Sequence, residues 1–338
     1  MPRREPAGRF PLAVLKNIRD SWENTRGDHE QRLSEILGQP WTISVDPPAL
    51  YPYAEDDWAQ QCLGDVIARS VPFISRFLTW AKVLIQNVPQ TLHFPSLLTL
   101  FVLLRYVEDV VDQLRYFVGL HGDEVKGEIN EICSAHILTL DYDDTKTVDY
   151  CGIRVSPEGK LMIVFNENRF GTNTSSAAEG DNLTNALNDV PSPKPMSFVV
   201  RSSIRRDYDP RIREIQEKLK RILKQEVSLV PNFEANFEEL KGNAGDDLNW
   251  RNFGNAHLSY FDALAVQLEY QKFGEDDMLQ EGLLEIMPKN AIHIRVVDQT
   301  KRTYNEVIAE DGILCLQTTP NHFGINASDV ASDIVNIL

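Results

Sequence analysis

The residues with the chemistry best suited to a metal site are two histidines, His136 and His293. They stand in two apolar runs, "AHILTLD" and "IHIRVVD", and we expect them to hold matching positions on two strands. Imidazole is a common zinc ligand, but zinc needs further ligands, and neither histidine belongs to an HxxxH pattern or accompanies a CxxC pair. We therefore interpret both as partly buried core residues and keep them only as weak metal candidates. No catalytic residue and no cofactor can be assigned.

The segment 141–150, "DYDDTKTVDY", alternates acids in the manner of a calcium loop. An EF-hand loop needs glycine at its sixth position and glutamate at its twelfth, whereas Lys146 and Gly152 stand there. The sequence instead predicts a solvated connection between a strand and a β-hairpin. Cys151 follows this connection, but a thiol nucleophile needs a nearby base that no sequence pattern supplies here. We do not expect Cys151 to be catalytic.

Recognisable catalytic motifs are absent from the sequence, which contains no GxGxxG, GxxxxGK[ST], GxSxG or HExxH pattern. The common nucleotide-binding, hydrolase and metalloprotease classes are therefore excluded, although an enzyme of an unfamiliar kind is not. One charged segment is distinctive: residues 201–224 carry nine Lys or Arg against four Asp or Glu. An acidic partner or a phosphate could bind it, but we interpret it as the polar face of a helix whose other face holds Ile212, Ile215 and Leu219.

The composition describes an acidic protein with a formal net charge of −16 over 338 residues. This charge opposes bulk attraction to nucleic acid and to anionic membranes. The longest apolar run, at 94–104, is shorter than the roughly 20 residues of a membrane-spanning helix. The four cysteines, Cys62, Cys133, Cys151 and Cys315, show no CxxC spacing, which favours reduced and mostly buried thiols. We expect a soluble, cytoplasmic protein.

The chain repeats itself. Residues 159–173, "GKLMIVFNENRFGTN", align without a gap to residues 312–326, "GILCLQTTPNHFGIN", with six identities at an offset of 153. Upstream, residues 113–132 align to 267–286 at an offset of 154, again with six identities, and Tyr150 recurs as Tyr304. Two nearly equal offsets over about sixty residues indicate an internal duplication.

A third match, of residues 32–39 to 218–225, has an offset of 186. Copy 1 therefore holds 32 residues that copy 2 lacks, and we place this helical insertion near 78–110. The apolar helix predicted at 94–114 must bury its surface somewhere. It is our candidate for a contact between the modules or in an oligomer.

The fold class predicted from the repeat is α+β, as a tandem duplication of two related modules. Each module has an amphipathic helix, a short strand, one or more long helices, a strand, a β-hairpin and a C-terminal helix. The long helices are expected at 58–85, 95–132 and 252–287, and the C-terminal helices near 176–188 and 328–337. We assign residues 1–187 and 201–338 to the modules and residues 188–200 to a proline-rich linker.

The repeated residues themselves suit structural roles. Leu161 and Leu314 should point inward from the second hairpin strand, and Phe170 and Phe323 should fill the gap between sheet and helix. Gly171 and Gly324 should adopt a backbone conformation closed to other residues. Asn173 and Asn326 suit an N-cap or a local turn.

Because these repeated residues suit structural roles, we expect the functional surface to lie where the two copies differ. The candidates are the insertion, the 141–149 connection and the groove between the modules. The leading hypothesis is a non-catalytic protein-interaction or binding protein. The alternative is a small-molecule enzyme or ligand binder with its site in the inter-module groove, since pockets are common at domain interfaces.

Overall fold

The computed structural model of the protein describes residues 22–54, 94–243 and 250–338. The chain divides into two compact units, residues 1–191 (unit 1) and residues 192–338 (unit 2). Between them, helix α8 ends at Asn188 and helix α9 begins at Phe198. The last three residues of the expected linker therefore already belong to a helix of unit 2.

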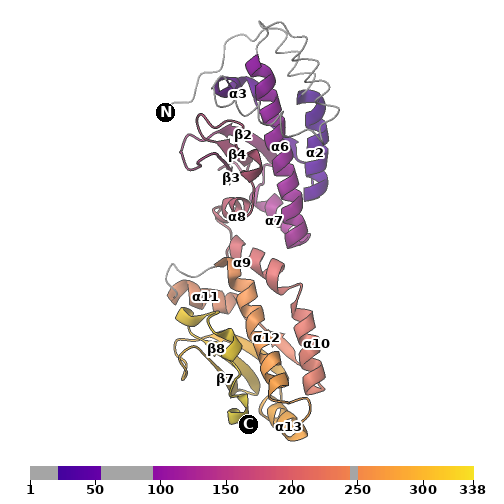
Figure 1. The fold of residues 1–338 in the computed structure, drawn as a ribbon, viewed down its shortest axis with the longest axis vertical. Helices are drawn as coiled ribbons and strands as arrows, with labels where there is room; N and C mark the ends of the chain where they lie inside the picture. Colours follow the sequence, from indigo (N-terminus) through magenta and orange to yellow (C-terminus); the bar gives the residue numbers. More distant parts are fainter. Residues whose placement is uncertain (1–21, 55–93, 244–249) are drawn as a thin grey trace. The chain divides into compact units, whose positions relative to one another are not determined.

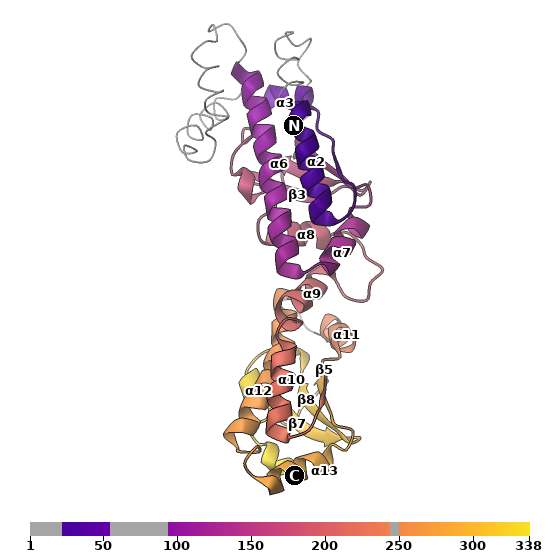
Figure 2. The same cartoon turned by 90° about the vertical axis from the view of Figure 1, so that its right-hand side faces the viewer.

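Unit 1 is a four-stranded sheet with helices packed on one face (Figures 1 and 2). Strands β1 and β2 are parallel, β2 and β4 are parallel, and β3 and β4 form the antiparallel hairpin, which gives the order β1-β2-β4-β3. Its elements are α2 (Asn24–Leu37), β1 (Thr42–Ile43), α3 (Pro47–Ala54), α6 (Phe94–His121), α7 (Glu124–Ile132), β2 (Ile137–Tyr142), β3 (Cys151–Val155), β4 (Leu161–Phe165), η2 (Thr174–Ser176) and α8 (Asp181–Asn188).

Unit 2 has the same arrangement of strands, in the order β5-β6-β8-β7 and with the same parallel and antiparallel pairings. Helices α10 and α12 again cover one face of its sheet (Figures 1 and 2). Its elements are α9 (Phe198–Ser203), η3 (Ile204–Tyr208), α10 (Ile212–Leu223), β5 (Ser228–Val230), α11 (Phe233–Asn243), η4 (Trp250–Asn252), α12 (Phe253–Tyr270), α13 (Asp277–Ile286), β6 (Ala291–Val296), β7 (Asn305–Glu310), β8 (Ile313–Thr318), η5 (Pro320–His322), η6 (Ala327–Asp329) and η7 (Ile334–Ile337).

The register of the two sheets agrees with the sequence offsets. Leu138 pairs with Leu161 in unit 1, and Ile292 pairs with Leu314 in unit 2. The 186-residue offset extends to the first residues of α3 and α11, Pro47 and Phe233. Both units are thus α+β, each with one four-stranded sheet, as the sequence predicts.

Two of the predicted long helices are each divided into two helices in the structure. The predicted helix at 95–132 is two helices, α6 and α7, separated by Gly122 with a φ of +77°. The predicted helix at 252–287 is likewise α12 and α13, because the chain turns at Lys272, whose φ is +64°. Asp276 then caps α13 by accepting hydrogen bonds from the N–H groups of Met278 and Leu279. The predicted helix at 58–85 and the first part of the predicted insertion, residues 78–93, lie outside the described residues.

The C-terminal helix predicted at 328–337 is wrong. Unit 2 ends in the short 3₁₀ helices η6 and η7, in which backbone bonds run from Val330 to Ala327 and from Ile334 to Ala331. Branched side chains such as Val330 and Ile334 are poor α-helix formers but are buried here by the tighter turns.

Apolar side chains of α6 form part of the core of unit 1. Between Val102 and Leu114 all of them except the partly exposed Leu104 are buried, and Tyr106 lies in an aromatic cluster with Phe165 and Phe170. This part of the predicted 94–114 helix is therefore covered by its own unit. Within the described ranges no helix is both long enough and apolar enough to cross a membrane.

Candidate functional site

The two histidines do not hold matching positions, contrary to the prediction. His136 precedes β2, has a φ of +50°, and its Nε2 lies 3.2 Å from the carbonyl oxygen of Asn130. The sheet register makes Asn290, also at φ +50°, its counterpart in unit 2. His293 lies inside β6 opposite Cys315. The prediction aligned two similar runs three residues out of register, because a histidine followed by isoleucine occurs in both.

Metal and thiol chemistry find little support in the described parts of the chain. There, no three His, Cys, Asp or Glu side chains gather closely enough to hold a metal ion. Burial lowers the pKa of His293, and the positive charges of Arg295 and Lys289 lower it further. Burial raises the pKa of the Cys133 and Cys151 thiols to about 12, so both are protonated and weakly nucleophilic at neutral pH.

The described cysteines, Cys133, Cys151 and Cys315, are buried free thiols, as the sequence indicated. Cys62 lies outside the described residues. The Cys151 thiol donates a hydrogen bond to the carbonyl oxygen of Asn173, at 3.1 Å.

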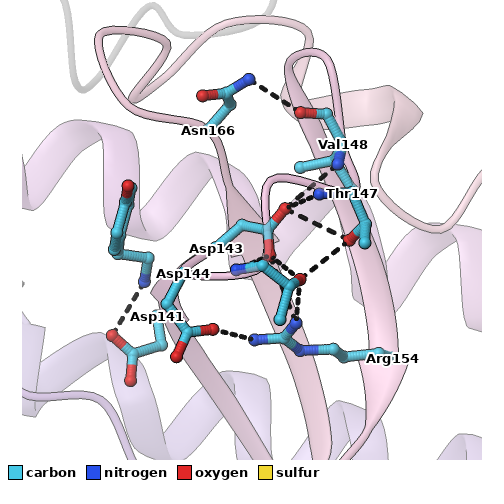
Figure 3. A network of polar contacts seen from close by, with 9 residues as sticks. Asp141, Asp143, Asp144, Thr147, Val148, Arg154 and Asn166 are labelled. Carbon is cyan, nitrogen blue, oxygen red and sulfur yellow. Dashed lines mark hydrogen bonds and ion pairs between the residues drawn. The ribbon is translucent and has the colours of Figure 1, made fainter. Parts of the chain in front are cut away.

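The 141–149 connection of unit 1 is folded around the carboxylate of Asp143 (Figure 3). This carboxylate accepts hydrogen bonds from the backbone N–H groups of Thr145, Thr147 and Val148, at 2.7 to 3.1 Å, and from both threonine hydroxyls. Arg154 of β3 adds a sixth donor, at 3.2 Å. With its oxygens occupied by N–H and O–H donors, Asp143 acts as an internal anchor for the loop and has little capacity left to ligate calcium.

The charge of Asp143 is stabilised by the loop that it anchors. Its side chain is fully buried, which by itself opposes ionisation, but the hydrogen bonds from Thr145, Val148 and Thr147 outweigh burial and lower the pKa of the carboxyl. The other guanidinium nitrogen of Arg154 pairs with the exposed Asp144 at 3.5 Å. The Asn166 side chain then donates to the carbonyl oxygens of Val148 and Asp149, which fixes the end of the connection (Figure 3).

This connection leads directly to Tyr150, a half-exposed aromatic residue. The Tyr150 side chain keeps 42% of its surface exposed, and the guanidinium of Arg169 lies 5.4 Å above the ring centre. At the equivalent place in unit 2, Tyr304 is 41% exposed and the ring of His322 packs edge-on against it at 5.0 Å. We call these two arrangements the tyrosine pairs.

The residues that position the tyrosine pairs belong to the loop after the last strand. Gly171 has a φ of +84° and Gly324 a φ of +77°, which confirms the conformation predicted for both. The N–H of Gly171 donates to the Tyr106 hydroxyl at 3.2 Å, and the N–H of Gly324 donates to the Tyr260 hydroxyl at 2.9 Å. These bonds hold the loop so that its arginine or histidine faces the exposed tyrosine.

The other repeated residues of the loop are also where the sequence suggests. Phe170 and Phe323 are buried, and so are Leu161 and Leu314. Asn173 and Asn326 each precede a 3₁₀ helix with left-handed backbone, and neither side chain forms a capping hydrogen bond. They therefore serve a turn, one of the two roles predicted for them.

Sequence reasoning missed Tyr106 and Tyr260. They are equivalent at the 154-residue offset, but "RYVED" and "SYFDA" share only the tyrosine, so no local run of identities marked them. The signal that could have found them is the extension of that offset a few residues beyond the recognised match.

The surroundings of the tyrosine–glycine bond differ between the units. In unit 1, Asp109 accepts a hydrogen bond from the Thr174 hydroxyl at 2.6 Å and pairs with Arg105 at 3.3 Å. Burial raises the pKa of Asp109 despite these partners. The equivalents of Asp109 and Thr174 in unit 2 are Ala263 and Ala327.

Cys151 is replaced in unit 2 by Asn305, a residue with more hydrogen bonds. Its amide nitrogen donates to the carbonyl oxygens of Ile325 and Asn326, and its oxygen accepts from the Tyr260 hydroxyl at 3.0 Å. Asn305 therefore ties the loop to α12 through Tyr260.

The basic segment 201–224 is largely the helix α10, preceded by α9 and η3. Ile215, Leu219 and Ile222 are buried, whereas most of its charged residues face solvent. The prediction of a helix with a charged face and an apolar face is confirmed for α10.

Comparisons with protein-family models, with curated proteins and with solved structures gave no match.

Proposed function

We propose that this chain is a two-module protein-interaction protein, and that each module presents one tyrosine pair to a partner. The observation that carries the proposal is the recurrence of the two pairs, Tyr150 with Arg169 and Tyr304 with His322, at equivalent positions and with nearly equal exposure. Core packing does not require a ring with two fifths of its surface in solvent. Tyrosine and arginine are the side chains that dominate binding energy at many protein interfaces.

The geometry of the pairs supports binding because each ring is held in place before a partner arrives. An arginine or a histidine on one side restricts the tyrosine, which lowers the conformational entropy lost on association. Tyr116 and Tyr270 also recur and are more exposed, at 69% and 81%, but among the described residues no ring or cation packs against them. They are therefore the weaker candidates.

The two pairs would meet partners of different charge. Besides the buried Asp143, the connection 141–149 beside Tyr150 has three aspartates and one lysine, whereas the corresponding segment 295–303 of unit 2 has three basic residues and one aspartate. Complementary charge accelerates association and selects partners. We therefore assign a basic partner surface to unit 1 and an acidic one to unit 2.

A duplicated module explains this arrangement. Equal strand order, equal register and the repeated tyrosine–glycine bond support descent of both units from one ancestor, followed by divergence of the loops. The free, buried thiols support a cytoplasmic location for the protein.

The alternative, a small-molecule enzyme, has weaker support. Cys133 and Cys151 are protonated at neutral pH. His257, which burial gives a pKa of about 4, is enclosed and bonded to Asn236 and to the Phe253 carbonyl oxygen. Cys151 and His257 are hydrogen-bonded within the core and Cys133 is fully buried, which does not support a role toward a substrate.

Site-specific photo-crosslinking would test the proposal. We would place benzoylphenylalanine at position 150 or 304, and at position 116 or 270 as matched controls for an exposed tyrosine. We expect protein adducts in extracts of expressing cells from the first two positions, and fewer in the presence of excess unlabelled protein. The proposal fails if positions 150 and 304 give no more adduct than positions 116 and 270.

A further inference from the structure

A shallow groove of about 260 Å³ runs between α10 and α12 in unit 2. It is lined by Arg211, Glu214, Ile215, Lys218, Arg221 and Asp262. Four of these residues are on α10 at positions that share one helix face, Arg211 is the N-cap of that helix, and Asp262 faces them from α12. The buried Ile215 forms part of the floor.

The arginines of this helix differ from its lysines in their pairing. Lys218 pairs with Glu269 at 3.0 Å, Lys220 with Glu226 and Lys224 with Asp277 at 3.1 Å. Arg211, Arg213 and Arg221 have no carboxylate within 4 Å among the described residues. Unpaired arginines are unexpected in a chain with 50 acidic and 34 basic residues. Two of the three line the groove.

The equivalent helix of unit 1 shows that the module does not need these cations. At the 186-residue offset, Arg211 corresponds to Thr25, Lys218 to Arg32 and Arg221 to Glu35. Arg32 is in turn neutralised by Asp112, at 2.6 Å. The same helix therefore packs on the same kind of sheet without these cations, so the module fold does not depend on the charge of α10.

We propose that the α10–α12 groove binds an amphipathic helix of a partner protein that carries acidic side chains ten residues apart. Arg211 and Arg221 are separated by ten residues, or about 15 Å along a helix axis, which is too far for a single phosphate to bridge. A helix laid along the groove presents side chains at the same spacing and an apolar residue over Ile215.

The carboxylates in the groove favour a peptide over other polyanions. Glu214 and Asp262 lie between and opposite the cations and repel an uninterrupted row of phosphates. A partner helix meets both signs, with glutamates toward Arg211 and Arg221 and a lysine toward Glu214 or Asp262. The net charge of −16 also opposes binding of RNA or of an anionic membrane.

Fluorescence anisotropy with a designed probe would test this groove. The probe is an alanine-based peptide of about 18 residues, long enough to form a helix. It carries two glutamates ten residues apart, one lysine, and a leucine three residues after the first glutamate, which puts the leucine on the same helix face as the glutamates. A shuffled peptide of equal composition places the glutamates side by side. We expect the full-length protein to bind the ordered peptide more tightly than the shuffled one.

Charge-reversal variants then distinguish peptide binding in the groove from binding elsewhere on the helix. Arg221→Glu should weaken binding of the ordered peptide about tenfold, because a favourable pair becomes a repulsive one. Arg221→Gln should weaken it by a smaller factor. Arg213→Glu makes the same charge change on the same helix but outside the groove, and should alter affinity less than about twofold. Both positions are exposed, and circular dichroism would verify folding of the three variants.

Several results would overturn the proposal. They are equal binding of the two peptides, no binding of either, or an equal loss in Arg213→Glu and Arg221→Glu. Tighter binding of a single-stranded RNA or of phosphatidylserine vesicles, lost in Arg221→Glu, would reassign the groove to a different polyanion. Tyr304→Ser should keep the affinity for the ordered peptide, which makes this test independent of the tyrosine pairs.

Discussion

Unit 1 and unit 2 hold the loop after the last strand by the same hydrogen bond, from a glycine N–H to a buried tyrosine hydroxyl. Around that bond they use different side chains. Unit 1 has Cys151 and the Asp109–Thr174 contact, whereas unit 2 has Asn305, which bonds the tyrosine and the loop together. The backbone position is thus common to both units, and the neighbouring side chains can change as long as the buried polar groups stay paired.

Substitution of the loop glycines is expected to produce the largest difference in stability loss between the units. Both Gly171→Val and Gly324→Val force a branched residue to positive φ. A Cβ at position 171 would also come within 2.8 Å of Val102, whereas one at position 324 would meet only Ala256, at 3.4 Å. We expect a loss of about 4 kcal/mol for Gly171→Val and about 2 kcal/mol for Gly324→Val. Hydrogen exchange of peptides from each unit would measure both.

Val102 and Ala256 are equivalent residues, which provides the control. In a protein that carries Ala256→Val, the stability lost through Gly324→Val should become as large as that lost through Gly171→Val. Equal losses in the two units without that change would show that neighbouring volume does not matter here and would contradict the comparison.

The second largest loss of stability should come from replacing Asn305 with cysteine, the residue that unit 1 has at this position. Asn305→Cys leaves the buried Tyr260 hydroxyl and two loop carbonyls without their amide partner, at a cost of about 2 kcal/mol to unit 2. Cys151→Ala removes only a weak thiol donor and should cost unit 1 less than about 1 kcal/mol. Urea unfolding of the variants would measure both, and a larger loss from Cys151→Ala would reverse the comparison.

Asp143 makes part of the stability of unit 1 dependent on pH. The pKa of its carboxyl is lower in the folded state, so it stabilises the fold above the usual carboxyl pKa, and this stabilisation is lost as pH falls below about 4. Asp143→Asn should therefore cost about 2 kcal/mol at pH 7 and much less at pH 3. The neighbouring Asp144→Asn, which changes an exposed carboxylate, is the matched control. A cost of Asp143→Asn that does not depend on pH would exclude the charge of Asp143 as the cause.

The smallest effect concerns Asp109, which unit 2 replaces with Ala263. Burial raises its pKa in the folded state, so its contribution to stability falls as pH rises through its ordinary pKa toward neutrality. The free energy of unfolding of Asp109→Ala, relative to that of the wild type, should therefore rise by up to about 1 kcal/mol as the pH is raised from 4 to 7. Thr174→Ala removes a hydrogen bond that lowers the pKa of Asp109 and should steepen the pH dependence of the otherwise unchanged protein. Thermal unfolding at several pH values would detect either change, and a pH-independent Asp109→Ala effect would count against it.

Sequence alone determined the elements that depend on local pattern. The repeat located the hairpins and the loop glycines at 171 and 324, because a positive φ restricts the residue type at the position itself. The two apolar runs identified β2 and β6, and the repeat identified Leu161 and Leu314 as buried residues. Helices α3 and α11 were not expected, since Pro47–Ala54 contains three prolines and Phe233–Asn243 lacks a clear apolar stripe.

Only the tertiary structure decided which side chains meet. The Gly171–Tyr106 and Gly324–Tyr260 bonds join residues 65 and 64 positions apart, and the charge of Asp143 is satisfied by a loop that folds back on it. Strand register, which separates His136 from His293, likewise depends on pairing with distant strands. The exposed tyrosines recur in the sequence as Tyr150 and Tyr304, yet their arginine and histidine partners become partners only when the loop is folded. The amino-acid sequence specifies residue types and local conformational preferences, whereas contacts between distant residues are set by the packing of the whole unit.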